Sequence, residues 1–383
     1  MSLKNILNVN DMKIAAKKRV PKMFFDYVES GSWEELTLKS NEDDYSKIKL
    51  KQKVAIDVSK RSTLVQILGQ EYNMPVALAP AGLTGLQKAD GEILAALAAE
   101  KFNVPYTLST FSICSLESVA KKVSKPFWFQ LYVMKDKKFM NELIFRAKNV
   151  NCSALIITLD LQVLGKRYKD VRNKLSIPPD FLCKKNLFNM LLKPRWMIEI
   201  LSTKNRNFGN ISGHALGVSN LKSLSKWVGN SFDESFCWEE IEKIRDVWKE
   251  KLILKGILDE EDAQKAVKIG ADAIIVSNHG GRQLDSTSSS ISMLHKIKKI
   301  VKQDAEIWID GGIRSGIDVI KACSLGADCT LIGRPYLYGL GAYGEKGVTK
   351  ILNIFKEDLE LAMALCGKTT IKDLNSKNII FEF

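Results

Sequence analysis

The chain has 383 residues, of which 45% are hydrophobic and 26% charged, a composition typical of a soluble globular protein. No apolar run reaches the roughly 18 residues that a membrane-spanning helix needs, and the first residues lack the apolar core of a secretory signal, so we expect neither an integral membrane protein nor a secreted one. The net charge of +13 favours anionic partners: nucleic acid, an anionic membrane or a small acidic substrate.

The seven cysteines are odd in number and far apart, without a C-x-x-C pair or a histidine at metal-ligand spacing. This pattern predicts reduced thiols and no structural metal site.

The first 73 residues read as a helical cap, with helices expected over 11–19 and 21–30 and a short hairpin-like stretch after them. We expect this segment to cover the bottom of the following domain and to send one part up to its active face.

Eight short apolar, β-branched runs then alternate with amphipathic segments of helical length. The predicted strands are 76–82, 104–109, 126–132, 153–160, 252–257, 273–279, 306–312 and 329–335, and the clearest predicted helices are 136–149, 260–269 and 316–325. This alternation predicts an α/β fold, a TIM (β/α)₈ barrel over 74–365, followed by a tail over 366–383. A doubly wound sheet is the competing fold, but it needs a G-x-G-x-x-G turn after its first strand, and the chain has none there.

The interval between the fourth and fifth strands, 161–233, is too long for an ordinary loop and is predicted to be a functional insertion. Residues 181–230 contain eight Lys and Arg residues and a single Glu. Within 181–201, large apolar residues alternate with basic ones, which suits a segment lying at a membrane interface. A mobile loop over the active site or an oligomer contact is the alternative interpretation.

Polar and charged residues follow the apolar strands at their carboxyl ends, where barrels of this class place their active sites. The loops after the last two strands contain Asp310-Gly311-Gly312-Ile313-Arg314 and Gly333-Arg334. Glycine amides and arginines in these loops predict a phosphate site for a cofactor or substrate.

The acid–base candidate is identified by scarcity, since the chain has only three histidines. His295 lies in a predicted helix and His214 in the insertion, so both are interpreted as bystanders. His279 ends a strand, and Asp160 ends another. A carboxylate beside an imidazole fixes its tautomer and stabilises its protonated form, so this pair is the predicted base and its partner.

These residues belong to longer motifs, SNHGGRQLD (277–285) and, in order along the chain, PKMFFDY (21–27), APAGLTG (79–85), FQLY (129–132), LGKR (164–167), LKGI (254–257) and DGGIR (310–314). Over most of its length the chain resembles the family of FMN-dependent L-2-hydroxy acid dehydrogenases and oxidases, and most of all the respiratory L-lactate dehydrogenases. The resemblance implies FMN as the cofactor and oxidation of an L-2-hydroxy acid, with L-lactate converted to pyruvate.

The same resemblance assigns roles to individual residues. His279 would be the base and Asp160 its partner; the substrate would be held by Tyr27, Tyr132, Arg167 and Arg282. The FMN site would comprise Ala79, Pro80, Ala81, Gly82, Ser109, Gln130, Thr158, Lys255, Ser277, Asp310, Gly311, Gly312, Arg314, Gly333 and Arg334. Lys255 would stabilise the anionic reduced flavin.

The stretch after Asp160 reads Leu161-Gln162-Val163, where the family often has a small polar residue and proline, which leaves the shape of the substrate pocket less determined. Without a haem motif in the chain, we expect electrons to pass to a quinone or a separate cytochrome. The resemblance implies a homo-oligomer, commonly a tetramer. The expected location is the cytoplasmic side of the inner membrane with peripheral attachment, or alternatively the cytoplasm.

Three alternatives remain at this point. The same barrel could serve an oxidase that uses oxygen and releases hydrogen peroxide. An FMN-dependent isomerase of isoprenoid diphosphates would share the phosphate loops but would not need the cluster around His279. A nucleic-acid-binding protein would need basic and aromatic residues gathered in a recognised module, and we find none, so no nucleic-acid partner is expected.

Overall fold

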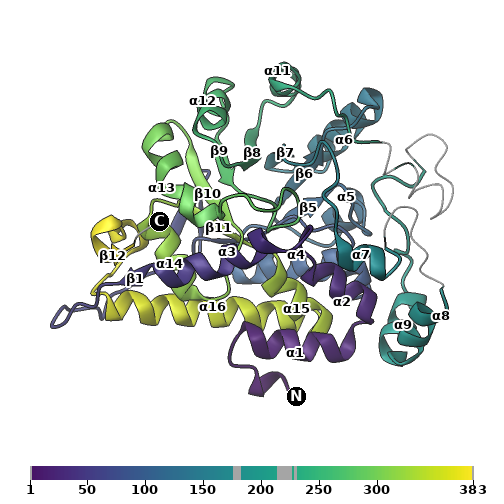
Figure 1. The fold of residues 1–383 in the computed structure, drawn as a ribbon, viewed down its shortest axis with the longest axis horizontal. Helices are drawn as coiled ribbons and strands as arrows, with labels where there is room; N and C mark the ends of the chain where they lie inside the picture. Colours follow the sequence, from purple (N-terminus) through teal and green to yellow (C-terminus); the bar gives the residue numbers. More distant parts are fainter. Residues whose placement is uncertain (1, 176–182, 214–226, 228–230, 382–383) are drawn as a thin grey trace.

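Eight parallel strands form the centre of the chain in its computed structural model (Figure 1). The structure describes residues 2–175, 183–213, 227 and 231–381. The strands are β4 (Val76–Leu78), β5 (Thr107–Ser109), β6 (Trp128–Tyr132), β7 (Ala154–Thr158), β8 (Lys251–Ile257), β9 (Ala273–Val276), β10 (Glu306–Asp310) and β11 (Cys329–Ile332). Their order is β4-β11-β10-β9-β8-β7-β6-β5, and a parallel bridge between Leu78 and Tyr106 joins β4 to β5. The predicted TIM barrel is therefore confirmed, and all eight predicted strands occur.

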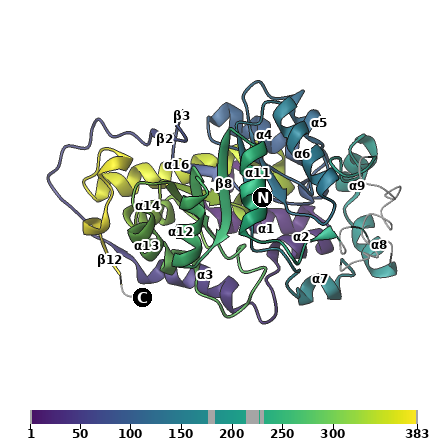
Figure 2. The ribbon, with the colours of Figure 1, turned by 90° about the horizontal axis from the view of Figure 1, so that it is seen from above.

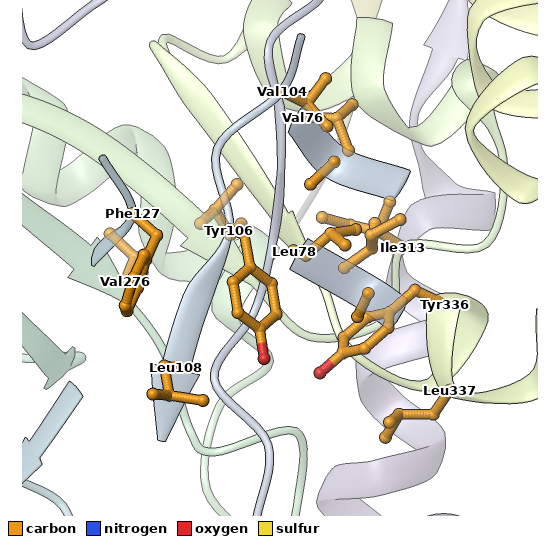
Figure 3. Close-up of a cluster of buried hydrophobic side chains, with 14 of the residues drawn as sticks. Val76, Leu78, Val104, Tyr106, Leu108, Phe127, Val276, Ile313, Tyr336 and Leu337 are labelled. Carbon is orange, nitrogen blue, oxygen red and sulfur yellow. The ribbon is translucent and has the colours of Figure 1, made fainter. Parts of the chain in front are cut away.

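The barrel strands are apolar on both sides because each separates two cores. Inside the barrel, the rings of Trp128 and Trp308 stack with centroids 4.8 Å apart. Outside, the strands pack against the surrounding helices. Figure 3 shows part of this outer layer, where Leu78 and Tyr106 lie near Tyr336. Strands buried on both faces read as continuous apolar runs, which is why the sequence predicts them well.

Helices alternate with the strands as expected (Figures 1 and 2). They are α4 (Gly91–Phe102), α5 (Leu116–Ala120), α6 (Lys137–Asn149), α11 (Trp238–Val247), α12 (Glu260–Lys268), α13 (Ser290–Val301), α14 (Gly316–Ser324), α15 (Arg334–Tyr343) and α16 (Glu345–Leu365), with the 3₁₀ turn η2 (Thr84–Leu86) before α4. Asp136, Asp259 and Ser315 cap the three helices that were predicted most clearly. Each side chain accepts a hydrogen bond from a backbone N–H of the first turn, which fixes where the helix begins.

The amino-terminal segment is divided among three places, and only one of them is the bottom of the barrel. The hairpin of β2 (Val65–Ile67) and β3 (Gln70–Tyr72) packs against the inner core, and Leu68 N donates to Glu306 Oε1 over 2.7 Å. The helix α1 (Val9–Arg19) packs against α15. The helices α2 (Lys22–Glu29) and α3 (Leu36–Lys47) lie beside the active face. The hairpin lies at the bottom, and α2 is the part that reaches the active face, where Tyr27 and Val28 line the cavity; α1 does neither, since it packs against α15.

Short elements complete the ends of the chain. Residues Leu3–Asn5 form η1, and the 3₁₀ turns η3 (Ile371–Asp373) and η4 (Ser376–Asn378) follow α16. The two-residue strands β1 (Lys49–Leu50) and β12 (Ile379–Ile380) pair in antiparallel fashion.

The insertion between β7 and β8 contains three helices in its described part: α7 (Tyr168–Arg172), α8 (Lys184–Leu191) and α9 (Pro194–Ser202). Both ribbon views show α8 and α9 at one edge of the molecule (Figures 1 and 2). The stretches 176–182, 214–226 and 228–230 of the predicted insertion, including His214 and the first two residues of 181–201, lie outside the described residues. In the part of the chain that the structure describes, no helix is both long and apolar enough to cross a membrane.

Candidate active site

A cavity of about 470 Å³ opens at the carboxyl ends of the barrel strands. Every strand contributes to its wall, through its last residues or the loop that follows. Most predicted site residues line it: Tyr27, Ala79, Pro80, Ala81, Gly82, Tyr132, Thr158, Arg167, Lys255, His279, Arg282, Asp310, Gly311, Gly312, Arg314, Gly333 and Arg334. Ser109, Gln130 and Ser277 are buried behind the wall, and Asp160 supports it through His279.

His279 and Asp160 form the predicted pair. The imidazole Nδ1 of His279 lies 2.8 Å from Oδ1 of Asp160. The backbone of His279 is left-handed, with φ +58°, and Gly280 and Gly281 continue with φ +63° and +71°. Three such residues in a row form a tight turn that carries the ring into the cavity, and the two glycines adopt it without a side-chain penalty.

The surroundings keep this base neutral. Burial lowers the pKa of His279, and the cations Lys255 and Arg167 lower it further, against the opposing effect of Asp160. Burial alone would raise the pKa of Asp160, but His279 and Lys255 outweigh it, so the pKa of this carboxyl falls. An ionised Asp160 accepts a hydrogen bond from Nδ1–H, which leaves the lone pair on Nε2 free to take up a proton.

Lys255 provides a fixed positive charge in the same cavity. Its Nζ lies 3.0 Å from Asp310 Oδ2 and 2.7 Å from Ser277 Oγ. Burial opposes the charged form, but Asp310 and Asp160 raise the pKa of Lys255 above its ordinary value. This ammonium group therefore remains charged and can stabilise negative charge that develops beside it.

Gly256 is a functional position that the sequence reasoning missed. It has φ +103° and lies at a β-bulge, where the pairing of β8 with β9 shifts between Lys255 and Ile257. A Cβ at Gly256 would lie only 2.7 Å from Cγ of Asp160. The isolated glycine inside a predicted strand was the available signal, because such glycines mark bulges and close approaches.

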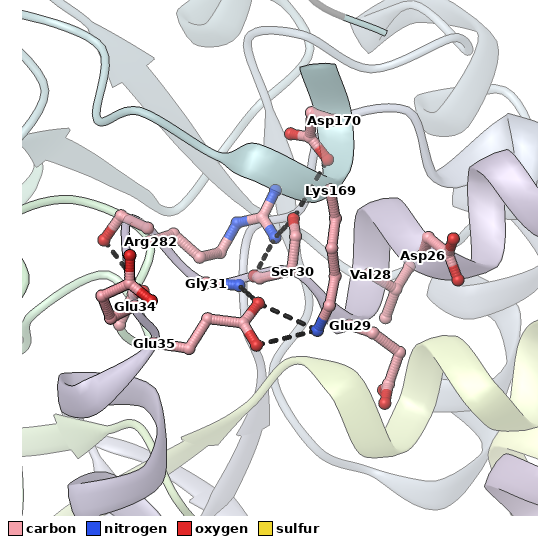
Figure 4. A network of polar contacts seen from close by, with 12 residues as sticks. Asp26, Val28, Glu29, Ser30, Gly31, Glu34, Glu35, Lys169, Asp170 and Arg282 are labelled. Atoms are coloured by element: carbon pink, nitrogen blue, oxygen red, sulfur yellow. Dashed lines mark hydrogen bonds and ion pairs between the residues drawn. The ribbon is translucent and has the colours of Figure 1, made fainter. Parts of the chain in front are cut away.

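Two arginines, Arg167 and Arg282, line the cavity together with His279, and Figure 4 shows Arg282 beside Ser30. Arg282 Nη1 donates to the carbonyl oxygens of Tyr27 over 2.7 Å and Ser30 over 2.8 Å, and its guanidinium carbon lies 4.7 Å from the centroid of the Tyr27 ring. Arg167 donates through Nε to the backbone oxygen of Arg282 over 3.3 Å. Burial and the charge of Arg167 lower the pKa of Arg282. Two neighbouring, partly buried guanidinium groups make a site for an anion such as a carboxylate.

The loop between α2 and α3 is fixed by further contacts in the same view (Figure 4). Ser30 Oγ donates to Asp170 Oδ1 over 3.1 Å, and Lys169 pairs with Glu35 at 2.9 Å. Since Lys169 and Asp170 belong to α7, the first helix of the insertion is connected directly to the loop that positions Tyr27.

The predicted phosphate loops have the backbone expected of them, with Gly311 at φ +90° and Gly312 at φ +81°. Their arginines also contact protein groups: Arg314 pairs with Glu42 at 2.7 Å, and Arg334 donates to the carbonyls of Val28, Ser30 and Gly280. Burial, together with the charges of Arg314 and Arg282, lowers the pKa of Arg334 to about 10. Arg334 therefore also ties α2 to the turn that follows His279.

An aromatic wall, which the sequence reasoning did not anticipate, closes one side of the cavity. Phe111 stacks on Tyr132 with ring centroids 5.1 Å apart, and Phe208 and Phe232 meet Phe111 edge-on at 6.1 and 5.9 Å. Phe208 and Phe232 come from the insertion, where no periodic pattern marks them. This wall gives an apolar surface for the side chain of a substrate.

Several buried polar atoms in this region have no partner within the described residues. They include Nε2 of Gln130, Oγ1 of Thr158 and Oδ1 of Asp310. Buried polar groups are nearly always satisfied, so these atoms indicate a polar ligand. Together with the glycine loops and Lys255 they fit a flavin with a phosphorylated side chain. Among the described residues, no group of His, Cys, Asp and Glu side chains is arranged to hold a metal ion.

Comparisons with known proteins find relatives along nearly the whole chain. The family model described as FMN-dependent dehydrogenase matches residues 16–381. A protein named L-lactate dehydrogenase from Vibrio parahaemolyticus is 43% identical over 371 residues, covering 97% of each chain. Another of the same name from Acinetobacter baylyi is 40% identical, covering 98% of this chain and 97% of its own.

A solved structure of a differently named protein has the same fold. The crystal structure of the monotopic membrane protein (S)-mandelate dehydrogenase superposes with a TM-score of 0.93 at 35% identity, covering 99% of this chain and 100% of that chain.

Proposed function

Because the chain belongs to the FMN-dependent dehydrogenase family, we propose that it oxidises an L-2-hydroxy acid and that L-lactate is its substrate. The observation that carries this proposal is the His279–Asp160 pair, held beside two partly buried arginines and the charge of Lys255. The relatives named L-lactate dehydrogenase, which align over nearly the whole chain, support the choice of lactate.

In the proposed reaction, Arg282 and Arg167 bind the carboxylate of the substrate, and Tyr27 and Tyr132 bind beside them. Burial raises the pKa of the Tyr132 hydroxyl, and the neighbouring Tyr27 and Asp160 raise it further. Tyr132 therefore stays protonated at neutral pH and can donate a hydrogen bond. A carboxylate held at two points fixes the orientation of the carbon that is oxidised.

The base is Nε2 of His279. It takes one proton from the substrate while Asp160, ionised and 2.8 Å from Nδ1, stabilises the imidazolium that forms. FMN, when bound, would supply the acceptor for the two electrons and the second proton that the substrate loses. Its ring and side chain would be held by the residues from Ala79 to Gly82 and by Ser109, Gln130, Thr158, Lys255, Ser277 and Asp310, and its phosphate by Gly311, Gly312, Arg314, Gly333 and Arg334.

Anaerobic mixing of the purified, FMN-loaded protein with L-lactate tests the proposal. We expect rapid bleaching of the flavin absorption in the wild type. His279→Gln should keep its yellow colour but bleach orders of magnitude more slowly, because the proton has no acceptor. If L-lactate leaves the wild-type flavin oxidised but (S)-mandelate or glycolate bleaches it, that acid replaces lactate as the proposed substrate. A protein that binds no FMN would overturn the function.

For the acceptor we propose a quinone or a cytochrome rather than oxygen, together with peripheral attachment to the cytoplasmic side of the inner membrane. The support is an exposed apolar surface on α8 and α9, which we call the α8–α9 surface. It comprises Leu187, Phe188, Leu191, Leu192, Ile198 and Leu201, with the exposed basic residues Lys184, Lys185 and Arg195 beside it. The monotopic (S)-mandelate dehydrogenase supports the same arrangement. Hydrogen peroxide formed in stoichiometric amounts under air would instead identify an oxidase.

We propose a homo-oligomer, a tetramer by family resemblance. Light scattering of the detergent-solubilised protein after size-exclusion chromatography would give the mass of the particle, and a mass of one chain would contradict the proposal.

A further inference from the structure

Asn41 of α3 and Asn278, the residue before His279, face each other with both amides paired. Asn41 Nδ2 donates to Asn278 Oδ1, and Asn278 Nδ2 donates to Asn41 Oδ1, each over 2.8 Å. Both side chains are buried, with exposures of 1% and 4%. The two residues are 237 positions apart, so this pair of hydrogen bonds joins the amino-terminal helix α3 to the loop that carries the base.

Asn278 also forms hydrogen bonds within the turn around His279, so Asn41 holds that turn through Asn278. Its Oδ1 also accepts a hydrogen bond from Gly281 N over 3.1 Å, and its Nδ2 donates to Ser288 O over 3.0 Å. The turn from 278 to 281 is therefore closed by the same side chain that Asn41 holds. Since His279 lies inside this turn in a left-handed conformation, movement of Asn278 would move the imidazole.

Asn41 also lies against the predicted phosphate loop. A Cβ at Gly312 would lie 1.8 Å from the backbone oxygen of Asn41, and one at Gly311 would lie 3.3 Å from its Nδ2. The side chain of Asn41 further accepts a hydrogen bond from Ser290 N over 3.2 Å. One residue of α3 thus contacts both the loop of the base and the loop after β10.

We propose that Asn41 is a positioning residue that holds His279 in its productive orientation and keeps the loop of Gly311 and Gly312 in place for the cofactor phosphate. The inference rests on the proposed oxidation of a 2-hydroxy acid. Asn41 does not line the cavity, so it acts through Asn278 and the loop rather than on the substrate.

Asn41→Leu tests this role, because leucine keeps the volume of the side chain and removes its two hydrogen bonds with Asn278 and the one from Ser290 N. Asn278 retains Gly281 and Ser288 as partners, which allows the loop to remain folded but free to shift. We expect kcat to fall on the order of 10- to 100-fold, as for a displacement of about 1 Å, while KM changes much less. The isotope effect with L-lactate deuterated at carbon 2 should rise as the chemical step becomes slower.

A second readout does not depend on activity. Titration of FMN with the apoprotein, followed by quenching of flavin fluorescence, should show weaker FMN binding in Asn41→Leu than in the wild type. Asn378→Leu is the matched control: Asn378 is also a buried asparagine, 5% exposed, but its side chain accepts a hydrogen bond from Asn375 N, the N-cap of η4, and it does not line the cavity. We expect it to lower thermal stability without changing kcat, the isotope effect or FMN affinity.

If Asn41→Leu yields no folded protein, Asn41→Ser carries the same test with a smaller change. An unchanged kcat and isotope effect in a folded Asn41 variant would overturn the positioning of His279, and an unchanged FMN affinity would overturn the role at the phosphate loop. A wild type that no 2-hydroxy acid reduces would instead contradict the proposed function, so the two failures are distinguishable.

Discussion

At the scale of single residues, the charge state of His279 determines whether the site can accept a proton. Burial, Lys255 and Arg167 lower its pKa, whereas Asp160 raises it. The net effect is a pKa below the ordinary 6.5, so the neutral, proton-accepting form predominates at neutral pH. Asp160 thus supports catalysis in two ways, by orienting the ring and by making the protonated form less costly than burial alone would allow.

This balance predicts the pH dependence of kcat/KM for L-lactate. The profile should be flat at neutral pH and should fall tenfold per pH unit on the acid side, with an apparent pKa below 6.5, because protonation of His279 in the free enzyme removes the base. Steady-state rates between pH 4.5 and 8 at constant ionic strength would measure it, with controls for unfolding at each pH.

The variant Asp160→Asn tests the direction in which Asp160 shifts the pKa of His279. Loss of the carboxylate charge removes an influence that raises the pKa of His279, so the acid limb should shift to still lower pH. The maximal kcat should fall on the order of 10³- to 10⁴-fold, as when the aspartate of a Ser-His-Asp triad is replaced. A shift of the acid limb to higher pH would contradict the assignment.

Arg282 gives a second prediction at this scale. Its guanidinium contacts Tyr27 and Ser30 through one nitrogen and keeps others for the substrate. Arg282→Lys retains a charge but cannot form both sets of bonds, so KM for L-lactate should rise sharply. Arg314→Lys is the comparison, since it should weaken FMN binding more than it changes KM. An unchanged KM and kcat in Arg282→Lys would remove Arg282 from the carboxylate site.

At the scale of elements, the sequence predicts the parts whose environment repeats. Barrel strands lie between two apolar layers, and helices such as α12 begin at a capping residue, so both can be read from local patterns. The catalytic residues are predictable because they occupy strand ends. The pairing of Asn41 with Asn278 and the contact of Phe208 with Phe111 are not, because each joins distant segments through side chains that look ordinary where they stand.

The bulge in β8 gives a prediction for an element. Gly256→Ala places a Cβ 2.7 Å from Asp160 Cγ on a backbone with φ +103°. We expect a loss of stability of about 1–3 kcal/mol from the strained backbone and a large fall in kcat as the carboxylate is pushed away from His279. Urea unfolding and anaerobic flavin reduction would measure the two effects separately.

Gly270→Ala is its matched control. Gly270 also has a positive φ, +79°, but a Cβ there would meet nothing within 4 Å. It should lower stability while leaving the rate of flavin reduction unchanged. Equal rates in the two alanine variants would show that the contact between Gly256 and Asp160 does not position the carboxylate.

At the scale of the whole molecule, the α8–α9 surface is firmly connected to the barrel. Trp196 Nε1 donates to Leu86 O over 2.9 Å, and the Trp196 ring lies 5.4 Å from that of Phe24. Lys88 pairs with Glu199 at 2.5 Å. Leu86 belongs to η2, which follows the strand whose end is assigned to the flavin. A membrane bound at this surface would therefore hold the mouth of the barrel in a fixed orientation, and the net charge of +13 would favour an anionic bilayer.

The last prediction distinguishes membrane binding by the α8–α9 surface from non-specific adsorption of exposed leucines. Replacing Leu191 and Leu192, which are 56% and 59% exposed, by serine should abolish co-sedimentation with vesicles of phosphatidylglycerol and phosphatidylethanolamine. Leu361→Ser with Leu365→Ser is the control, because these leucines of α16 are equally exposed, at 59% and 63%, but lie outside the α8–α9 surface.

Salt at about 0.5 M should weaken wild-type binding only in part, since screening reduces the attraction between charges but not apolar insertion. Both double variants should reduce flavin with L-lactate at the wild-type rate, while only the α8–α9 variant should lose reduction of membrane-embedded quinone. If that variant still sediments with vesicles and reduces the quinone, the membrane contact lies elsewhere on the molecule.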